Sequence, residues 1–419
     1  MNHFIYRENE LYCEDLPVQR IAAQIGTPFY LYSHATLTRH FKAFNEAFEG
    51  IDRLVCFSAK ANTNLAILKL FANLDCGLDI VSGGELYRGI QAGFAPNHIV
   101  YSGVGKRVDE IDYALKSGIL MFNLESLDEL KLINQRAGRL NQRARIAIRV
   151  NPDVDPKTHP YISTGLKKNK FGIDTAAALE GYRLAGSLEH IEVIGIDCHI
   201  GSQITEAGPF EDALNSIKTL IKQLKSELGI QIQYVDMGGG LGITYADETP
   251  PSLKEYAKAF LENLEGMDLT LILEPGRVLV GNAGILVTRV LYKKAGKGKN
   301  FIIVDAGMND LLRPTLYNAF HAIEPIVRSQ APLTVADVVG PICESGDFLA
   351  VDRNLTEVNA DDLLAVMSTG AYGFVMSSNY CSRPRVAEVM VKNNQYHVVK
   401  KRETYQDLVK GESIPTFME

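Results

Sequence analysis

The sequence has no long hydrophobic run. Its longest uncharged apolar stretch covers only residues 278–288 and is interrupted by glycine and asparagine, so it is too short to cross a bilayer. Residues 1–20 carry several charges and lack the apolar core of a signal peptide. We therefore expect a cytoplasmic protein that does not engage a membrane.

Cysteine pairs and a surplus of positive charge are also lacking. The six cysteines contain no C-x-x-C pair and no zinc-finger spacing with histidine, which predicts reduced thiols and no metal site. Lys and Arg number 43 against 50 Asp and Glu, for a net charge of −7. A nucleic-acid partner is not expected, because proteins that bind the phosphate backbone usually have a basic surplus.

Short apolar runs alternate with amphipathic helical segments over the first two thirds of the chain. Continuous apolar runs followed by helices indicate parallel strands covered on both faces. Eight runs fit an α/β fold of the (β/α)8 TIM-barrel type, with a doubly wound sheet as the competing fold. The glycine cluster follows the seventh run rather than the first, which favours the barrel. The runs are residues 54–57, 78–81, 99–102, 120–124, 146–150, 193–198, 234–237 and 271–273.

Beyond about residue 286 the pattern changes to short strand-like segments separated by Gly, Pro and Asn. This predicts a second, C-terminal β-rich domain resembling a β-sandwich or barrel. The predicted domains are residues 30–285 for the barrel, and residues 286–419 together with 1–29 for the β-rich domain. The basic stretch 293–299 is interpreted as a hairpin loop.

Polar residues follow most of the eight runs, at the end of a barrel where function is located. Lys60 follows the first run, and its amine could act as a nucleophile toward an aldehyde or simply face solvent. Asp79 lies within the second run. Glu274 could keep a pyridine nitrogen protonated or pair with Arg277. His199 could stack on a planar ring or be a hydrogen-bonded core residue.

A glycine-rich loop, GGGLG at residues 238–242, follows the seventh run. Its backbone N–H groups could cradle a phosphate, although a tight turn would have the same composition. In the second domain, Arg313 could clamp a carboxylate or lie on the surface, and Cys343 could donate a proton or be an inert thiol.

The motifs SAKAN, HIGSQ, GGGLG, EPGR, CESGD and GAYG occur in this order from residue 58 to residue 373. Together they resemble the pyridoxal-phosphate decarboxylases that combine an alanine-racemase-like barrel with a β-domain. The resemblance implies pyridoxal 5'-phosphate as cofactor and a homodimer in which Cys343 and Glu344 reach the partner's site.

The resemblance also implies roles for individual residues. Lys60 would bind the cofactor covalently, His199 would stack on its ring, and Cys343 would protonate the reacting carbon. The implied cofactor site comprises Lys60, Asp79, His199, Ser202, Gly239, Gly240, Glu274, Gly276, Arg277 and Tyr372, and the implied substrate site comprises Arg277, Arg313, Tyr317, Glu344 and Tyr372.

The implied activity is the decarboxylation of meso-2,6-diaminopimelate, an amino acid, to L-lysine and CO2 in lysine biosynthesis. The alternative is a decarboxylase of the same fold acting on ornithine, arginine, lysine or a carboxylated polyamine. Glu344 argues against the ornithine type, which usually has aspartate after the cysteine, and Arg313 suggests a second substrate carboxylate. A racemase or an inactive regulator fits the motifs less well. We also hypothesise that Lys170 pairs with Asp347 across the dimer.

Overall fold

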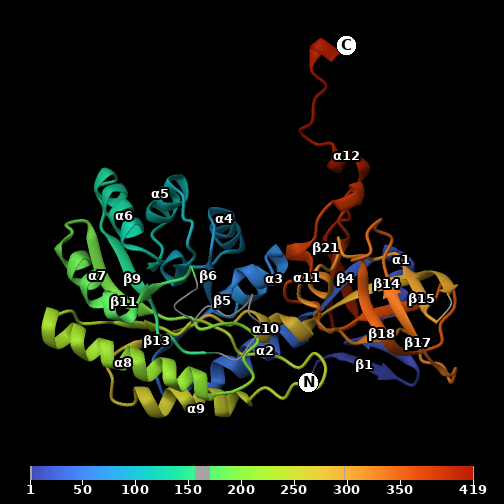
Figure 1. Cartoon of the computed structure of the whole chain (residues 1–419), viewed down its shortest axis with the longest axis horizontal. Coiled ribbons are helices and arrows are strands. Elements are labelled where there is room, and N and C mark those ends of the chain that lie inside the picture. Colours follow the sequence, from blue (N-terminus) through green and yellow to red (C-terminus); the bar gives the residue numbers. More distant parts are fainter. Residues whose placement is uncertain (1, 156–169, 297, 419) are drawn as a thin grey trace. The chain divides into compact units, whose positions relative to one another are not determined.

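The computed structural model describes residues 2–155, 170–296 and 298–418 (Figure 1). The chain forms two compact units: one is Thr38–Leu279, and the other combines Met1–Leu37 with Val280–Glu419.

The unit Thr38–Leu279 is built around a closed barrel of eight parallel strands, which confirms the predicted fold. Strands pair in chain order, and the barrel closes where β13 pairs with β5, with Leu273 opposite Val55. A two-residue strand, β10 (Ile173–Asp174), adds to the edge of β9. The barrel strands are β5 (Arg53–Ser58), β6 (Gly77–Ile80), β7 (Ile99–Tyr101), β8 (Met121–Leu124), β9 (Ala144–Asn151), β11 (Ile191–Asp197), β12 (Tyr234–Asp236) and β13 (Thr270–Leu273).

Helices surround the strands, and α8 and α9 lie side by side along one edge (Figure 1). Several start at a side-chain cap: Ser82 accepts from Glu85 N, and Ser126 accepts from Glu129 N. The helix α3 was not predicted from the sequence. The helices are α2 (His34–Ala47), α3 (Leu65–Ala72), α4 (Gly83–Ala92), α5 (Val108–Ser117), α6 (Leu127–Arg139), α7 (Thr175–Ser187), α8 (Gly208–Leu228), α9 (Leu253–Leu264) and α10 (Arg277–Val280).

The barrel interior changes character along its axis. One buried layer is apolar and includes Cys56, Val100, Met121 and Ile272. Toward the carboxyl ends of the strands the buried side chains become polar. Burying polar groups is unfavourable unless they are hydrogen-bonded, so this half of the barrel is a candidate for function.

The other unit is a β-rich structure. Its main sheet has the order β18-β17-β15-β14-β4-β20-β21, with β19 also paired to β14 and β16 to β19. The predicted hairpin is confirmed, because β14 and β15 pair antiparallel, but residues 293–295 of the predicted loop belong to β14 and pair with Ile302, Phe301 and Asn300. Several strands of this unit were not predicted from the sequence, namely β1, β2, β3, β16, β17 and β21. The strands are β1 (Phe4–Arg7), β2 (Glu10–Cys13), β3 (Leu16–Pro17), β4 (Phe29–Ser33), β14 (Gly284–Ala295), β15 (Asn300–Val304), β16 (Ile323–Pro325), β17 (Leu333–Val339), β18 (Phe348–Thr356), β19 (Leu363–Val366), β20 (Ala387–Lys392) and β21 (Gln395–Lys400).

The predicted boundary at residue 30 falls inside β4, and all of β4 belongs to the β-rich unit. The reason is strand pairing, since β4 lies between β14 and β20. Its side chains are buried on both faces, with Phe29 and Leu31 packing against Ile285 and Val389 in the core of this unit. The N-terminal segment therefore completes a sheet whose other strands come from the C-terminal third of the chain.

Within the described residues, no helix is long and apolar enough to cross a membrane. No group of three or more His, Cys, Asp or Glu side chains in that part of the chain is arranged to hold a metal ion.

Candidate functional site

Lys60 lies at the carboxyl end of β5, in a short 3-10 turn formed by Ala59–Ala61. Its Nζ donates to Asp79 Oδ2 at 3.2 Å, and Ser58 Oγ donates to the same oxygen at 2.6 Å. The Asp79 side chain is fully buried, whereas that of Lys60 is 37% exposed. Asp79, at the end of β6, thus anchors the amine while leaving it accessible.

Glu274 follows β13 and is buried. Its backbone N–H donates to Gly238 O at 2.8 Å, and its Oε1 accepts from Ser102 Oγ at 3.3 Å. Burial, and next the nearby Asp236, raises the pKa of Glu274 well above its usual value. The loop after β13 also contacts the Lys60 turn, because Ser58 N donates to Pro275 O at 3.1 Å. A Cβ at Gly276, the next residue of this loop, would lie 3.1 Å from Ala61 Cβ and 3.2 Å from Ser58 Cβ, so Gly276 packs against residues on either side of Lys60.

Asp236, at the end of β12, was not among the predicted site residues. It is completely buried and accepts from Gly238 N at 2.9 Å and from Asn123 Nδ2 at 3.0 Å. Burial, followed by the charge of Asp197, raises the pKa of Asp236 to about 7. The sequence signal that could have identified Asp236 is a carboxylate inside an apolar run. Asn123 in β8 is likewise a polar residue inside an apolar run.

The glycine loop after β12 is packed against the loops that follow β11 and β13. A Cβ at Gly239 would lie 2.2 Å from Glu274 O, so only glycine fits there. Gly240 has a φ of +120° and lies close to Gly201 O. His199 Nδ1 accepts from Gly239 N at 3.2 Å, which places the imidazole proton on Nε2. Burial, and then the charges of Arg149 and Lys60, holds the pKa of His199 well below its usual value, so the ring is neutral.

Arg277 and Ser202 lie together at the same end of the barrel, as predicted. The Arg277 Nη2 donates to Ser202 Oγ at 3.0 Å, and its Nη1 donates to Tyr245 OH at 2.7 Å. Tyr245 was missed because it follows the glycine loop without a recognisable motif. These hydrogen bonds fix a cation and two hydroxyl groups beside the loop, a combination suited to an anion.

A buried arginine, Arg149 at the end of β9, neutralises part of the acidic interior. Its Nη1 donates to Glu125 Oε1 at 2.7 Å, its Nη2 donates to His199 O at 3.4 Å, and Nε lies 4.0 Å from Asp197 Oδ2. A single guanidinium on β9 therefore links residues at the ends of two other strands, β8 and β11. Removing it would leave buried, unpaired carboxylates.

The β-rich unit holds the other predicted residues. Arg313 begins the short helix α11 (Arg313–Tyr317), is only 6% exposed, and is therefore not a surface residue. Its Nη1 lies 2.8 Å from His321 Nε2. Thr315 Oγ1 on the same helix donates to Gly346 O at 2.6 Å, which joins α11 to the CESGD loop. Arg313, Tyr317 and this loop are thus parts of one local structure.

Cys343 and Glu344 are exposed on the CESGD loop. Glu344 Oε2 accepts from Tyr380 OH at 2.7 Å. Asp347 closes the loop by accepting from Met308 N and Ile342 N, both at 2.6 Å. These bonds give Asp347 a role within its own chain, and its pairing with Lys170 across a dimer stays a prediction. Tyr372 has a φ of +55°, a strained conformation for a non-glycine residue.

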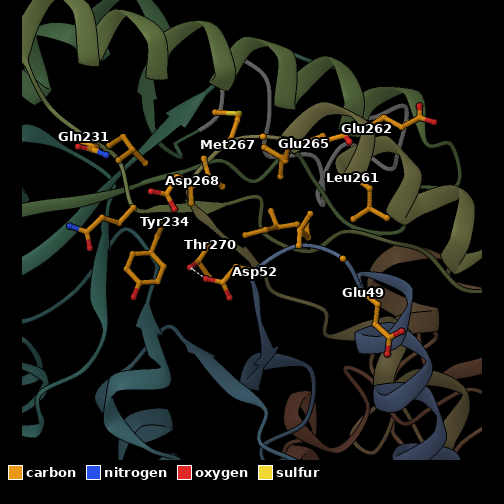
Figure 2. A pocket seen from close by; sticks show the side chains of 18 residues that line it. Glu49, Asp52, Gln231, Tyr234, Leu261, Glu262, Glu265, Met267, Asp268 and Thr270 are labelled. Carbon is orange, nitrogen blue, oxygen red and sulfur yellow. Dashed lines mark hydrogen bonds between the residues drawn. The ribbon is translucent and has the colours of Figure 1, made fainter.

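A cavity of about 690 Å³ opens at the opposite end of the barrel, at the amino ends of β12, β13 and β5. Figure 2 shows Tyr234, Thr270 and Asp52 in its wall, with the hydrogen bond from Thr270 to Asp52 drawn as a dashed line. None of the predicted site residues lines this cavity. In barrels of this type the functional end is that of the strand carboxyl termini, so the Lys60 end is the candidate site.

Residues 34–281 match the family described as pyridoxal-dependent decarboxylase, pyridoxal binding domain, and the chain belongs to this family. Two curated proteins that it resembles are both named diaminopimelate decarboxylase. That of Aquifex aeolicus is 50% identical over 408 residues, covering 96% of each chain, and that of Pseudomonas aeruginosa is 51% identical over 414 residues, covering 99% of each chain.

The chain is also similar to solved structures of proteins with the same name. The diaminopimelate decarboxylase of Helicobacter pylori, complexed with L-lysine, has 45% identity and a TM-score of 0.91, with 94% of this chain and 98% of that chain covered. The M. jannaschii enzyme in co-complex with L-lysine has 37% identity and a TM-score of 0.95, with both chains covered completely. The predicted family, the enzyme class of carboxy-lyases and the pyridoxal cofactor are confirmed.

The residues at the barrel end fit pyridoxal phosphate. The Lys60 amine matches the aldehyde, the buried Glu274 matches the basic pyridine nitrogen, and the glycine loop with Arg277 matches the phosphate. Asp79 Oδ1 is buried and accepts no hydrogen bond from the part of the chain that the structure describes. Glycine at position 239 lets the loop pack directly against the backbone of Glu274, where a Cβ would clash.

Proposed function

We propose that this chain decarboxylates meso-2,6-diaminopimelate to L-lysine and CO2 with pyridoxal 5'-phosphate, as the last step of lysine biosynthesis. The reaction type is supported by one arrangement above all: the accessible amine of Lys60, anchored by Asp79, at the same barrel end as the buried Glu274. The substrate is supported by the full-length similarity to proteins that bear this activity in their names.

Bound pyridoxal phosphate supplies an electron sink for the pair of electrons left when the carboxylate departs as CO2. Lys60 would hold the cofactor through its amine, and Asp79, which accepts from both Ser58 Oγ and Lys60 Nζ, orients that amine. His199, neutral and fixed by Gly239 N, presents a flat ring with its proton on Nε2. Such a ring would stack on the cofactor without adding positive charge.

Glu274 would hold a proton at the pyridine nitrogen of the bound cofactor. Its position is fixed by Ser102 and by the backbone of Gly238. Because burial raises the pKa of Glu274, this side chain would keep a proton available for the pyridine nitrogen, and the ion pair formed when the proton moves to the ring would be poorly screened by water. Ser202, Arg277 and the backbone of Gly239 and Gly240 bind the phosphate.

For the substrate, we assign recognition of the far carboxylate to Arg277 and Arg313 and recognition of the far ammonium group to Glu344. Tyr317 and Tyr372 complete the substrate site, and Tyr372 also contributes to the cofactor site. Cys343 donates the proton that replaces the lost carboxylate. Its exposure on the CESGD loop is consistent with a role in a homodimer in which Cys343 and Glu344 enter the partner's site. Six free thiols are consistent with the cytoplasm.

The test is to incubate the protein and pyridoxal phosphate separately with meso-diaminopimelate, L-ornithine, L-arginine and L-lysine, and to measure CO2. Release from meso-diaminopimelate with L-lysine as product is expected. Release only from ornithine or another single-carboxylate substrate would replace this proposal with the alternative of a related decarboxylase.

A further inference from the structure

The side chain of His321 is completely buried in the β-rich unit, and no motif in the sequence draws attention to it. It lies after α11 and just before β16. Its Nε2 is 2.8 Å from Arg313 Nη1, and its Nδ1 is 2.8 Å from Met367 O. The imidazole therefore bridges the guanidinium to the backbone that follows β19.

These two contacts fix the tautomer. A guanidinium nitrogen can only donate and a carbonyl oxygen can only accept. Nε2 must therefore accept from Arg313, and Nδ1 must carry the proton that it donates to Met367 O. His321 is held as a neutral imidazole, and it acts as a hydrogen-bond acceptor for a buried cation.

The backbone around His321 is fixed as well. Arg353 Nη1 donates to His321 O at 2.8 Å, and Met367 N donates to Ala322 O at 2.8 Å. The backbone that carries the imidazole is thus hydrogen-bonded to β18 and to the residue after β19, and is not a loose loop. A long arginine side chain has many rotamers, and a rigid acceptor at one nitrogen selects among them.

We infer that His321 is a positioning residue that orients Arg313 toward the carboxylate which the substrate and product share. This inference rests on the proposed function, because it takes that carboxylate as the ligand of Arg313. With Nη1 held by His321, the guanidinium plane is set before the substrate arrives. The ordering cost of binding is lowered, and the affinity for a ligand with this carboxylate rises.

Two substitutions separate orientation from general packing. His321→Asn places an amide near the position of Nδ1, so it keeps a donor for Met367 O but has no acceptor within reach of Arg313. His321→Gln places its amide oxygen near the position of Nε2, so it restores the acceptor for Arg313. Thr288→Val is the matched control, since it removes other hydrogen bonds of the same unit, which Thr288 Oγ1 donates to Asp305 Oδ1 and accepts from Ala306 N.

The readout is the affinity of the holoenzyme for L-lysine, which has the carboxylate, and for 1,5-diaminopentane, which lacks it, measured by calorimetry. His321→Asn should weaken L-lysine binding about tenfold, leave 1,5-diaminopentane within about twofold, and raise KM for meso-diaminopimelate about tenfold with kcat nearly unchanged. His321→Gln should recover most of the loss, and Thr288→Val should change neither affinity.

Equal weakening of both ligands in His321→Asn, or no weakening of either, would overturn the positioning role. A combination of Arg313→Ala with His321→Asn should bind L-lysine no more weakly than Arg313→Ala alone, and additive losses would also overturn it. These outcomes are distinct from failure of the proposed function, which would appear as a parent enzyme that releases no CO2 from meso-diaminopimelate.

Discussion

Asn123 on β8 donates to Asp236 on β12 across the interior of the barrel, with 3.0 Å between Asn123 Nδ2 and Asp236 Oδ2. The same amide nitrogen lies 3.1 Å from Ser102 Oγ, which in turn donates to Glu274. A line of hydrogen bonds thus runs from Asp236 at the end of β12 through Asn123 on β8 and Ser102 after β7 to Glu274. Burial raises the pKa of Glu274, and the charge of Asp236 raises it further, so the two acids are linked both by this line and by their charges.

The stability of the apoprotein should fall as pH rises from about 4 to about 7. Burial raises the pKa of Asp236 to about 7, so the folded state retains a proton that the unfolded state has already released. This stabilisation is complete below the pKa that Asp236 has in the unfolded state, and it is lost as pH rises through the pKa that Asp236 has in the folded state. Asp236→Asn should reduce this loss by roughly 1–3 kcal/mol, measured as the difference between urea unfolding free energies at pH 5 and pH 7.5.

The matched control for this experiment is Asp310→Asn, which removes a buried carboxyl in the other unit. Burial also raises the pKa of Asp310 to about 7, and it accepts from Gly307 N at 3.0 Å. Asp310→Asn should flatten the pH dependence similarly but leave cofactor affinity unchanged, whereas Asp236→Asn should alter both. If the unfolding free energy of Asp236→Asn depended on pH as steeply as that of the parent, Asp236 would not be the group that retains the proton.

Lys60→Ala should abolish covalent attachment of the cofactor. The substitution removes the amine that bonds to the aldehyde, so the visible absorbance of the bound cofactor should change to that of the free aldehyde and turnover should fall at least about a thousandfold. Lys69→Ala, at an exposed lysine of α3, is the control and should behave as the parent. Retention of a borohydride-reducible cofactor adduct in Lys60→Ala would exclude this role for Lys60.

Cys343→Ala should preserve the fold and cofactor binding but lower kcat by about 10²- to 10⁴-fold, the usual contribution of a positioned proton donor. Because Cys343 is exposed on its loop, the melting temperature should change little. Cys381→Ala, at the other exposed cysteine, serves as the control. Steady-state rates with meso-diaminopimelate measure the effect, and full activity of Cys343→Ala would remove it from the proton-donor role.

Tyr245→Phe should weaken pyridoxal phosphate binding by roughly three- to tenfold. The phenol accepts from Arg277 Nη1 at 2.7 Å, and its loss frees a buried guanidinium from one of its anchors. Equilibrium dialysis of the cofactor gives the affinity directly. Tyr256→Phe, at a fully buried tyrosine of α9, should leave the affinity unchanged. Equal affinities of parent and Tyr245→Phe would show that this anchor does not affect the site.

The sequence determined the eight barrel strands, because each is a continuous apolar run that is buried on both faces. It also indicated the end at which Lys60, His199, Glu274 and Arg277 lie, since the carboxyl ends of parallel strands meet at one edge. Both the strands and this end of the barrel can be predicted from the order and the types of the residues alone.

The tertiary structure decided what the sequence could not express. The partners of a buried polar side chain come from distant strands, so the links from Asn123 to Asp236 and from Arg313 to His321 depend on strand pairing and register rather than on local pattern. The N-terminal strand β4 belongs to the β-rich unit for the same reason, since its neighbours β14 and β20 lie far along the chain. Local periodicity specifies an element, but only packing specifies its neighbours.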